Sequence, residues 1–150
     1  MGSARLCLLG RVMLGWLGQD PAWVSGILHW RWVLFAARLA LTSSFLLGGL
    51  TKLFNFSAAI AEQEHFGLRP GWLWATLTIL IELGGSVLVL SGYAVWLGAG
   101  ALGCLTAVAM FKADNFWTKS GQERLTQANT FFEHLGLIGG FVLIAFIYAR

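Results

Sequence analysis

Four long apolar stretches make up most of this 150-residue chain, at residues 33–53, 72–90, 93–111 and 130–148. Each is close to the ~20 residues that an α-helix needs to cross ~30 Å of hydrocarbon. The chain is 57% hydrophobic and 11% charged, whereas soluble domains carry about 25% charged residues. The sequence therefore predicts an all-α integral membrane protein, with a four-helix bundle over residues 33–150.

The connections between the stretches predict the topology. Ser91-Gly92 leaves room only for a tight turn, so the second and third spans are antiparallel neighbours. The longer connections, 54–71 and 112–129, then lie on the opposite side of the membrane, which we call the loop side. Basic residues occur on both sides, so the positive-inside count does not decide the orientation.

Residues 1–32 precede the bundle. Residues 5–18 place apolar side chains on one helical face, with Arg5 and Arg11 on the other. This pattern predicts a short amphipathic helix in the membrane interface, with a disordered tail as the alternative. Two turn-forming dipeptides predict a linker at 19–26. Because a basic interfacial helix favours an anionic cytoplasmic leaflet, we expect both termini in the cytoplasm.

Three ionisable residues, Arg38, Glu82 and Glu133, lie inside predicted spans. A charge at the centre of a bilayer is unfavourable by roughly 2.5–3.5 kcal/mol on insertion scales, so such residues usually face a bundle interior, a partner or a wet cavity. In three spans the polar and small residues share one helical stripe, which we expect to face the bundle axis. The stripes are Arg38, Thr42, Phe45, Gly49 and Lys52 in the first span, Thr78, Glu82 and Ser86 in the second, and Asn129, Glu133, Gly136 and Gly140 in the fourth.

Depths along these helices predict two polar layers. With a rise of ~1.5 Å per residue, Glu82 lies roughly 15 Å and Arg38 roughly 22 Å from the loop side, within reach of one another. Lys52, Glu133 and His134 lie within roughly 6 Å of the loop-side edge. We therefore expect a deep Arg38–Glu82 pair and a shallower Lys52–Glu133–His134 group. The alternatives are a structural ion pair that fixes helix register and a Lys52 that extends to the interface.

Several kinds of site are not expected. No Cys/His cluster has the spacing of a metal site, and only His134 among the histidines lies in a span, whereas haem held across spans needs two axial ligands. Cys7 and Cys104 are far apart and form no Cys-x-x-Cys motif. The basic residues are scattered, which does not suggest nucleic-acid binding. We therefore expect no intrinsic cofactor and no metal.

Three segments resemble the DoxX family of small four-span bacterial membrane proteins. They read RLALTSSFLLGGLTKLFNF at 38–56, ILIELGGSVLVLSGYAVWLGAGAL at 79–102, and QANTFFEHLGLIGGFVLIAF at 127–146. The resemblance implies a membrane redox function, because one branch of the family resembles the membrane subunits of a thiosulfate:quinone oxidoreductase and other members are linked to oxidative-stress complexes. The positions that match the family pattern are Arg38, Gly48, Lys52, Glu82, Gly85, Trp117 and Glu133.

The leading hypothesis is a quinone-binding membrane subunit of a redox complex. Lys52 and His134 would hydrogen-bond the quinone oxygens, Glu133 and Glu82 would exchange protons, and Arg38 with Glu82 would form the polar floor. A few convergent polar groups in an apolar cleft are typical of such a site. The aromatic residues expected to line the ring site are Phe45, Phe54 and Phe132.

Two other functions remain open. The chain could be a non-enzymatic scaffold or assembly factor that docks a partner protein through its long loops, or an oligomeric small-solute transporter. Small residues at four-residue spacing would suit a homo-oligomeric helix face. In each case we expect a multi-pass protein of the bacterial inner membrane.

Overall fold

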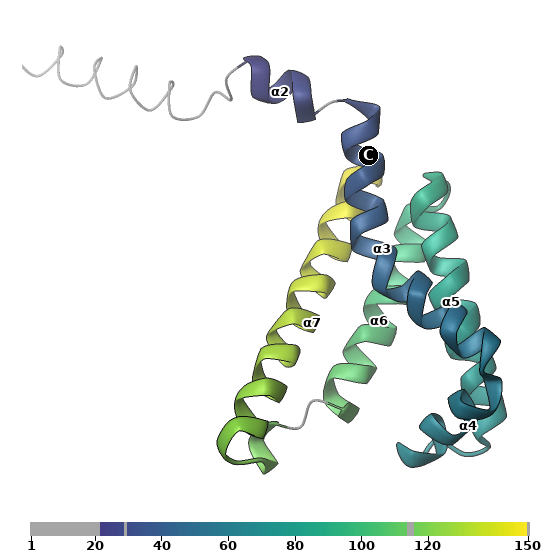
Figure 1. Ribbon diagram of the computed structural model, residues 1–150. Coiled ribbons are helices and arrows are strands. Elements are labelled where there is room, and N and C mark those ends of the chain that lie inside the picture. Colours follow the sequence, from purple (N-terminus) through teal and green to yellow (C-terminus); the bar gives the residue numbers. More distant parts are fainter. Residues whose placement is uncertain (1–21, 29, 114–115, 150) are drawn as a thin grey trace, which may run out of the picture. The chain divides into compact units, whose positions relative to one another are not determined.

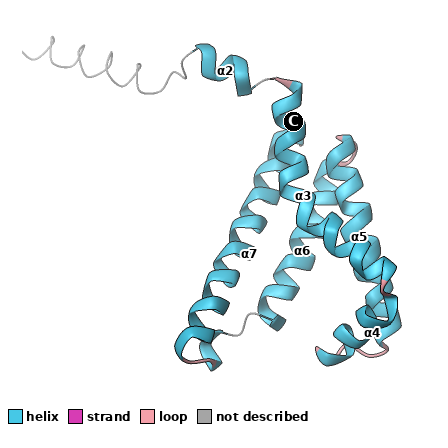
Figure 2. Ribbon diagram, viewed as in Figure 1, coloured by secondary structure: helices cyan, strands magenta, loops and turns pink. Residues whose placement is uncertain are grey.

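The computed structural model of the protein describes residues 22–28, 30–113 and 116–149. The chain divides into two units, Met1–Ala37 and Arg38–Arg150. Every regular element in the described residues is a helix, and these residues contain no strand (Figure 2). The prediction of an all-α protein is confirmed.

A short helix, α2 (Ala22–Leu28), lies in the first unit. The amphipathic helix predicted at 5–18 falls outside the described residues. The linker predicted at 19–26 is wrong over its second half, because α2 begins there. Pro21 directly precedes α2 in the sequence. Proline is tolerated at the start of a helix because the first N–H groups of a helix have no hydrogen-bond partner within it.

Four helices within the described residues are long and apolar enough to cross a membrane, which confirms the four predicted spans. They are α3 (Arg31–Phe54), α5 (Gly71–Ser91), α6 (Val95–Ala113) and α7 (Gly121–Tyr148), as Figure 1 shows. α7 begins earlier than the predicted residue 130, because the polar residues before its apolar part continue the same helix. The chain is therefore a multi-pass membrane protein.

The first predicted loop, 54–71, contains a further helix, α4 (Phe56–His65). Asn55 separates it from α3, and the Asn55 side chain accepts a hydrogen bond from the Ala58 backbone N–H at 3.4 Å. Such a side-chain acceptor is what the first turn of a helix requires. α4 packs against α5, beside its loop-side end in Figure 1.

The connection between α5 and α6 is the tight turn that the sequence predicts. Gly92 ends α5 in the left-handed conformation, at φ 79°, which glycine adopts without steric cost. The two helices then approach closely, because a side chain at Gly98 would place its Cβ 2.7 Å from the Gly85 carbonyl oxygen. Glycine at these positions lets the backbones of α5 and α6 touch.

The apolar core of the Arg38–Arg150 unit lies where α5, α6 and α7 meet. Its buried members are Val89, Ala99, Leu102 and Phe141. Phe45 of α3 contacts the Phe141 ring edge-to-face, with centroids 5.5 Å apart. Most large apolar side chains outside this core are exposed, as lipid-facing positions of membrane helices must be.

Candidate functional site

An ion pair between α3 and α5 forms the polar centre of the bundle. The Lys52 Nζ lies 2.7 Å from the Glu82 Oε1, and the two side chains are 19% and 9% exposed. Glu82 lies at the middle of α5, which is far from either membrane surface for a spanning helix. A charge here requires a partner, and Lys52 provides it.

A glycine of α3 lets the two helices that carry this pair pack closely. A Cβ on Gly49 would lie 2.8 Å from the Leu83 side chain, closer than atoms can approach. A Cβ on Gly48 would lie at ordinary contact distances, 3.5 Å from the Glu82 Oε2 and 3.7 Å from the Lys52 Nζ, so both charged groups lie beside the α3 backbone. Gly49 therefore brings α3 close enough for Lys52 to reach Glu82.

The predicted Arg38–Glu82 pair is wrong. The Arg38 Nη1 donates to the Val89 carbonyl oxygen at 3.4 Å, and the guanidinium lies 5.6 Å from the centre of the Tyr148 ring. Val89 is two turns beyond Glu82, about 10 Å along the helix. Arg38 thus binds the carboxyl end of α5, where carbonyl groups lack partners within the helix and cations are favoured.

The helix break at Asn55 explains why the predicted depths failed. They placed Lys52 near the loop-side edge, as if α3 covered the whole length of α5. Instead α3 ends near the middle of α5, and α4 covers the remaining turns, with Gly71 of α5 close to Ile60 and Glu64 of α4. Lys52 therefore lies at the level of Glu82.

The expected inward stripes are confirmed on two helices and wrong on the third. Thr42 of α3 and Ser86 of α5 are buried, and each hydroxyl donates to the carbonyl oxygen four residues earlier. On α7, by contrast, Asn129 and Glu133 are exposed. α7 turns the large Phe141 into the core instead, where its ring packs edge-to-face against Phe45. In lipid, such side-chain packing rather than removal of apolar surface from water holds helices together.

The predicted Lys52–Glu133–His134 group does not form. The Glu133 Oε1 accepts a hydrogen bond from the Asn129 Nδ2 at 2.9 Å, whereas Lys52 binds Glu82. His134 is half-buried on α7. The predicted ring-site aromatics also lie elsewhere: Phe45 packs in the core, and Phe54 and Phe132 are 85% and 62% exposed.

Lys52 and Glu82 line one end of a cavity of about 500 Å³ between α4, α5 and α6. Along α6 it extends from Ala101 to Lys112, about 16 Å at the rise of an α-helix. Its walls are mostly apolar and include Trp74, Leu77, Ile81, Ala101, Leu105 and Val108. Arg38, Glu133 and His134 are not among the residues that line it.

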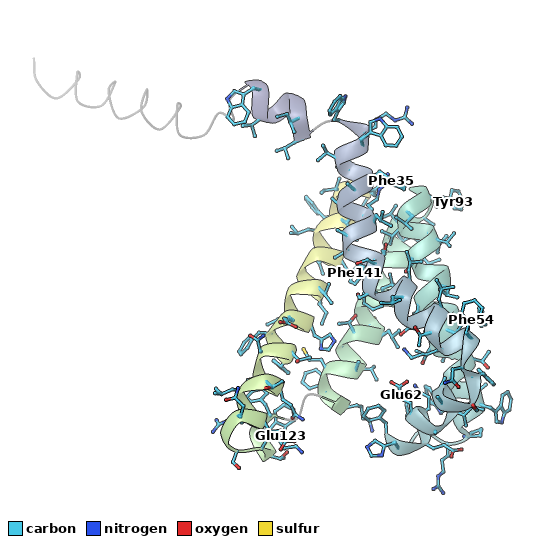
Figure 3. The ribbon with its side chains drawn as sticks, viewed as in Figure 1. Phe35, Phe54, Glu62, Tyr93, Glu123 and Phe141 are labelled. Carbon is cyan, nitrogen blue, oxygen red and sulfur yellow. The ribbon has the colours of Figure 1, made fainter. Side chains whose placement is uncertain are left out.

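The loop-side end of this cavity carries further polar residues. Glu62 and Gln63 come from α4, and Lys112 comes from the end of α6. In Figure 3, Glu62 extends from α4 on the side that faces the end of α6. The cavity is thus apolar along its walls and polar at both ends.

The ion pair keeps unused hydrogen-bonding capacity. Among the described residues, the Glu82 Oε2 is buried without a hydrogen-bond partner. An ammonium has three N–H groups, and the one recorded hydrogen bond of Lys52 within the described chain goes to Glu82. A ligand in the cavity can therefore accept from Lys52, which is the more exposed of the two side chains, whereas the Glu82 Oε2 is itself covered by protein. The described residues contain no group of three or more His, Cys, Asp or Glu that could hold a metal ion.

Sequence reasoning missed most residues of this cavity, Trp74 and Gln63 among them. Trp74 matches an interfacial tryptophan by position, although its side chain contributes to the cavity wall. Gln63 lies in a segment that reads as a loop, although it shares the α5-facing side of α4 with Ala59. Ala59 and Gln63 are four residues apart, and this spacing was the signal that could have placed Gln63 on the same buried helical face as Ala59.

Comparison of the sequence with models of protein families gives a match over more than half of the chain. The family model described as DoxX matches residues 33–115, a range that contains both residues of the ion pair. Comparison with curated proteins and with solved structures gave no match.

Proposed function

Because the chain belongs to the DoxX family, we propose that it is the quinone-binding membrane subunit of a redox complex. Its quinone ring lies in the cavity between α4, α5 and α6, with one ring oxygen at Lys52 and Glu82. The observation that carries this proposal is the buried ion pair at one end of a mostly apolar cavity, beside helices that are long and apolar enough to cross a membrane.

The cavity suits an amphipathic ring compound. Ligand sites are typically 300–1,000 Å³ in volume and mostly apolar, with a few placed polar groups, and this cavity has about 500 Å³. Trp74, Leu77 and Leu105 offer apolar surface for a ring. A lipid-soluble ligand is the class that reaches such a site from within a bilayer.

The ion pair serves both oxidation states of the ligand. A quinone oxygen only accepts hydrogen bonds, and Lys52 donates one. A quinol hydroxyl donates, and the Glu82 carboxylate accepts. When a quinol is oxidised it releases two electrons and two protons. Glu82 takes up one proton, the other passes to water at the loop-side end of the cavity, and the two electrons go to an oxidised redox group of a partner subunit.

The remaining predicted residues have other roles in this proposal. Arg38 holds the carboxyl end of α5 in place, so it positions Glu82 through the helix and does not touch the ligand. Glu133 lies outside the cavity, so the proton-exchange role falls to Glu82. We place the protein in the bacterial inner membrane with both termini in the cytoplasm, as the basic N-terminal sequence favours.

Quinol titration into lipid nanodiscs tests the proposal. We expect saturable binding of a short-chain quinol to the wild type, and at least about tenfold weaker binding to Glu82→Leu, because the hydrogen bond that the quinol hydroxyl donates to the charged carboxylate contributes about 1.5–3 kcal/mol. Glu133→Leu is the matched control and should bind as the wild type does. Absent saturable binding, or an equal loss in both variants, would contradict the proposal.

A second function, a scaffold for a membrane partner, is favoured by the outer face of α7. Phe141 is the only residue of the described part of α7 that is buried, and Glu133 is exposed on it. A carboxylate that faces lipid is unfavourable, and donors from a partner helix would relieve it. A stoichiometric partner crosslinked to α7, in a preparation that binds no quinone, would support this function instead.

A further inference from the structure

We propose that Gln63 is the second polar anchor of the cavity and that it selects ring ligands with an oxygen at both ends. This inference rests on the proposed function and specifies its ligand: a para-quinone or quinol, rather than a lipid with a single polar group. Gln63 lies on α4, outside every segment in which the sequence predicted a site.

Gln63 is a largely buried residue whose side-chain amide keeps some accessible surface. The residue is 7% exposed, it lines the cavity, and its amide atoms are not among the fully buried ones. Its hydrogen bond within the described residues is the backbone one, from the Leu68 N–H to its carbonyl oxygen. The amide can therefore hydrogen-bond a ligand in the cavity without giving up a protein partner.

The other polar residues of α4 differ from Gln63. Ser57, Glu62 and Glu64 are exposed, whereas Ala59 and Gln63 form the buried face toward α5. Gln63 thus lines the same cavity as Glu82, which has a carboxylate oxygen without a partner in the described chain. A ligand that hydrogen-bonds both the Gln63 amide and the ion pair explains why a glutamine lies on the buried face of α4.

The two anchors lie at different levels of the same cavity. Lys52 and Glu82 are at the middle of α5, and Gln63 is in the last turn of α4, toward the loop side. A para-quinone carries its two oxygens on opposite sides of the ring, so one meets the ion pair and the other meets the amide. The amide can donate to a carbonyl oxygen and accept from a hydroxyl, so it serves both oxidation states.

The test compares two ligands of the same shape, a short-chain para-quinol and the matching phenol that lacks one hydroxyl, in nanodiscs. The wild type should bind the quinol about tenfold more tightly, the effect of one neutral hydrogen bond. Gln63→Leu should bind both ligands alike, at the affinity of the wild type for the phenol. A second variant, Gln63→Asn, keeps the amide on a shorter side chain. It should therefore keep part of the preference for the quinol over the phenol.

A stability measurement separates ligand recognition from a structural role. Without ligand, Gln63→Leu should unfold at about the same denaturant concentration as the wild type, because the substitution removes no side-chain hydrogen bond within the described residues. Gln127→Leu is the control: the Gln127 Oε1 is buried without a partner in the described chain, but Gln127 does not line the cavity, so its ligand preference should equal that of the wild type.

The two proposals fail in different ways. If the wild type binds neither ligand, the proposed function fails. If the wild type binds the quinol but Gln63→Leu keeps the full preference for it, or if Gln63→Leu is less stable than the wild type without ligand, the role of Gln63 is overturned while the proposed function stands.

Discussion

At the scale of single residues, the centre of this protein is a carboxylate that lipid would not tolerate alone. Glu82 lies at mid-helix in α5, and Lys52 neutralises it at 2.7 Å. Each charge makes the other acceptable in the interior, since removing one partner leaves an uncompensated buried charge. The Glu82 Oε2 is buried without a hydrogen-bond partner among the described residues, so the pair does not satisfy all of its hydrogen-bonding groups.

A double-mutant cycle measures this dependence. We expect Lys52→Met and Glu82→Gln each to lower the free energy of unfolding in detergent, and the double variant to lose less than the sum of the two. Residues in contact typically show coupling of about 0.5–3 kcal/mol. Purely additive losses would mean that the ion pair does not form in the membrane.

The sequence was sufficient to predict that Glu82 is buried, but not to name its partner. Burial follows from a charge in the middle of an apolar span, and the stripe with Ser86 gave the correct face. The partner depended on where α3 ends relative to α5. Asn55 ends it early, and no hydropathy pattern distinguishes a helix break within a membrane domain from the end of a span.

At the scale of helices, the faces that meet are determined more by close backbone contact at glycines than by the positions of polar residues. The α3 backbone contacts α5 at Gly49, and the α5 backbone contacts α6 between Gly85 and Gly98. On α7 the polar stripe predicted the wrong face, because Phe141 takes the buried position. Four-residue spacing of small residues is easily read from a sequence, but which of several such faces meets a neighbour depends on side-chain packing.

Alanine substitutions of two helical glycines test the α3–α5 contact. Gly49→Ala would place a Cβ 2.8 Å from the Leu83 side chain, and overpacking of this kind costs about 1–3 kcal/mol. Gly84→Ala is the control, since a Cβ there meets nothing within 4 Å and should stabilise α5 by roughly 0.5–1 kcal/mol. Chemical unfolding followed by circular dichroism gives both values. Equal effects of the two substitutions would show that α3 does not pack closely on α5.

At the scale of the whole molecule, four helices of the described chain are long and apolar enough to span a membrane, and residues of α3, α5, α6 and the short α4 line the cavity. The fold was predictable because the bilayer sets the length and apolarity of each span. The cavity was not, because it depends on α4, a short helix whose polar exposed face resembles a loop in sequence. The family match covers residues 33–115, which include every residue that lines the cavity.

Photolabelling with an azido-quinone, in native membranes and with peptide mapping by mass spectrometry, tests the central claim most directly. We predict label on the cavity-lining segments of α5 and α6, residues 74–82 and 101–112, which is removed by excess unlabelled quinone and reduced in Glu82→Leu. Label confined to the outer face of α7, at Leu143 or Phe146, or label that unlabelled quinone does not displace, would contradict a quinone site at Lys52 and Glu82.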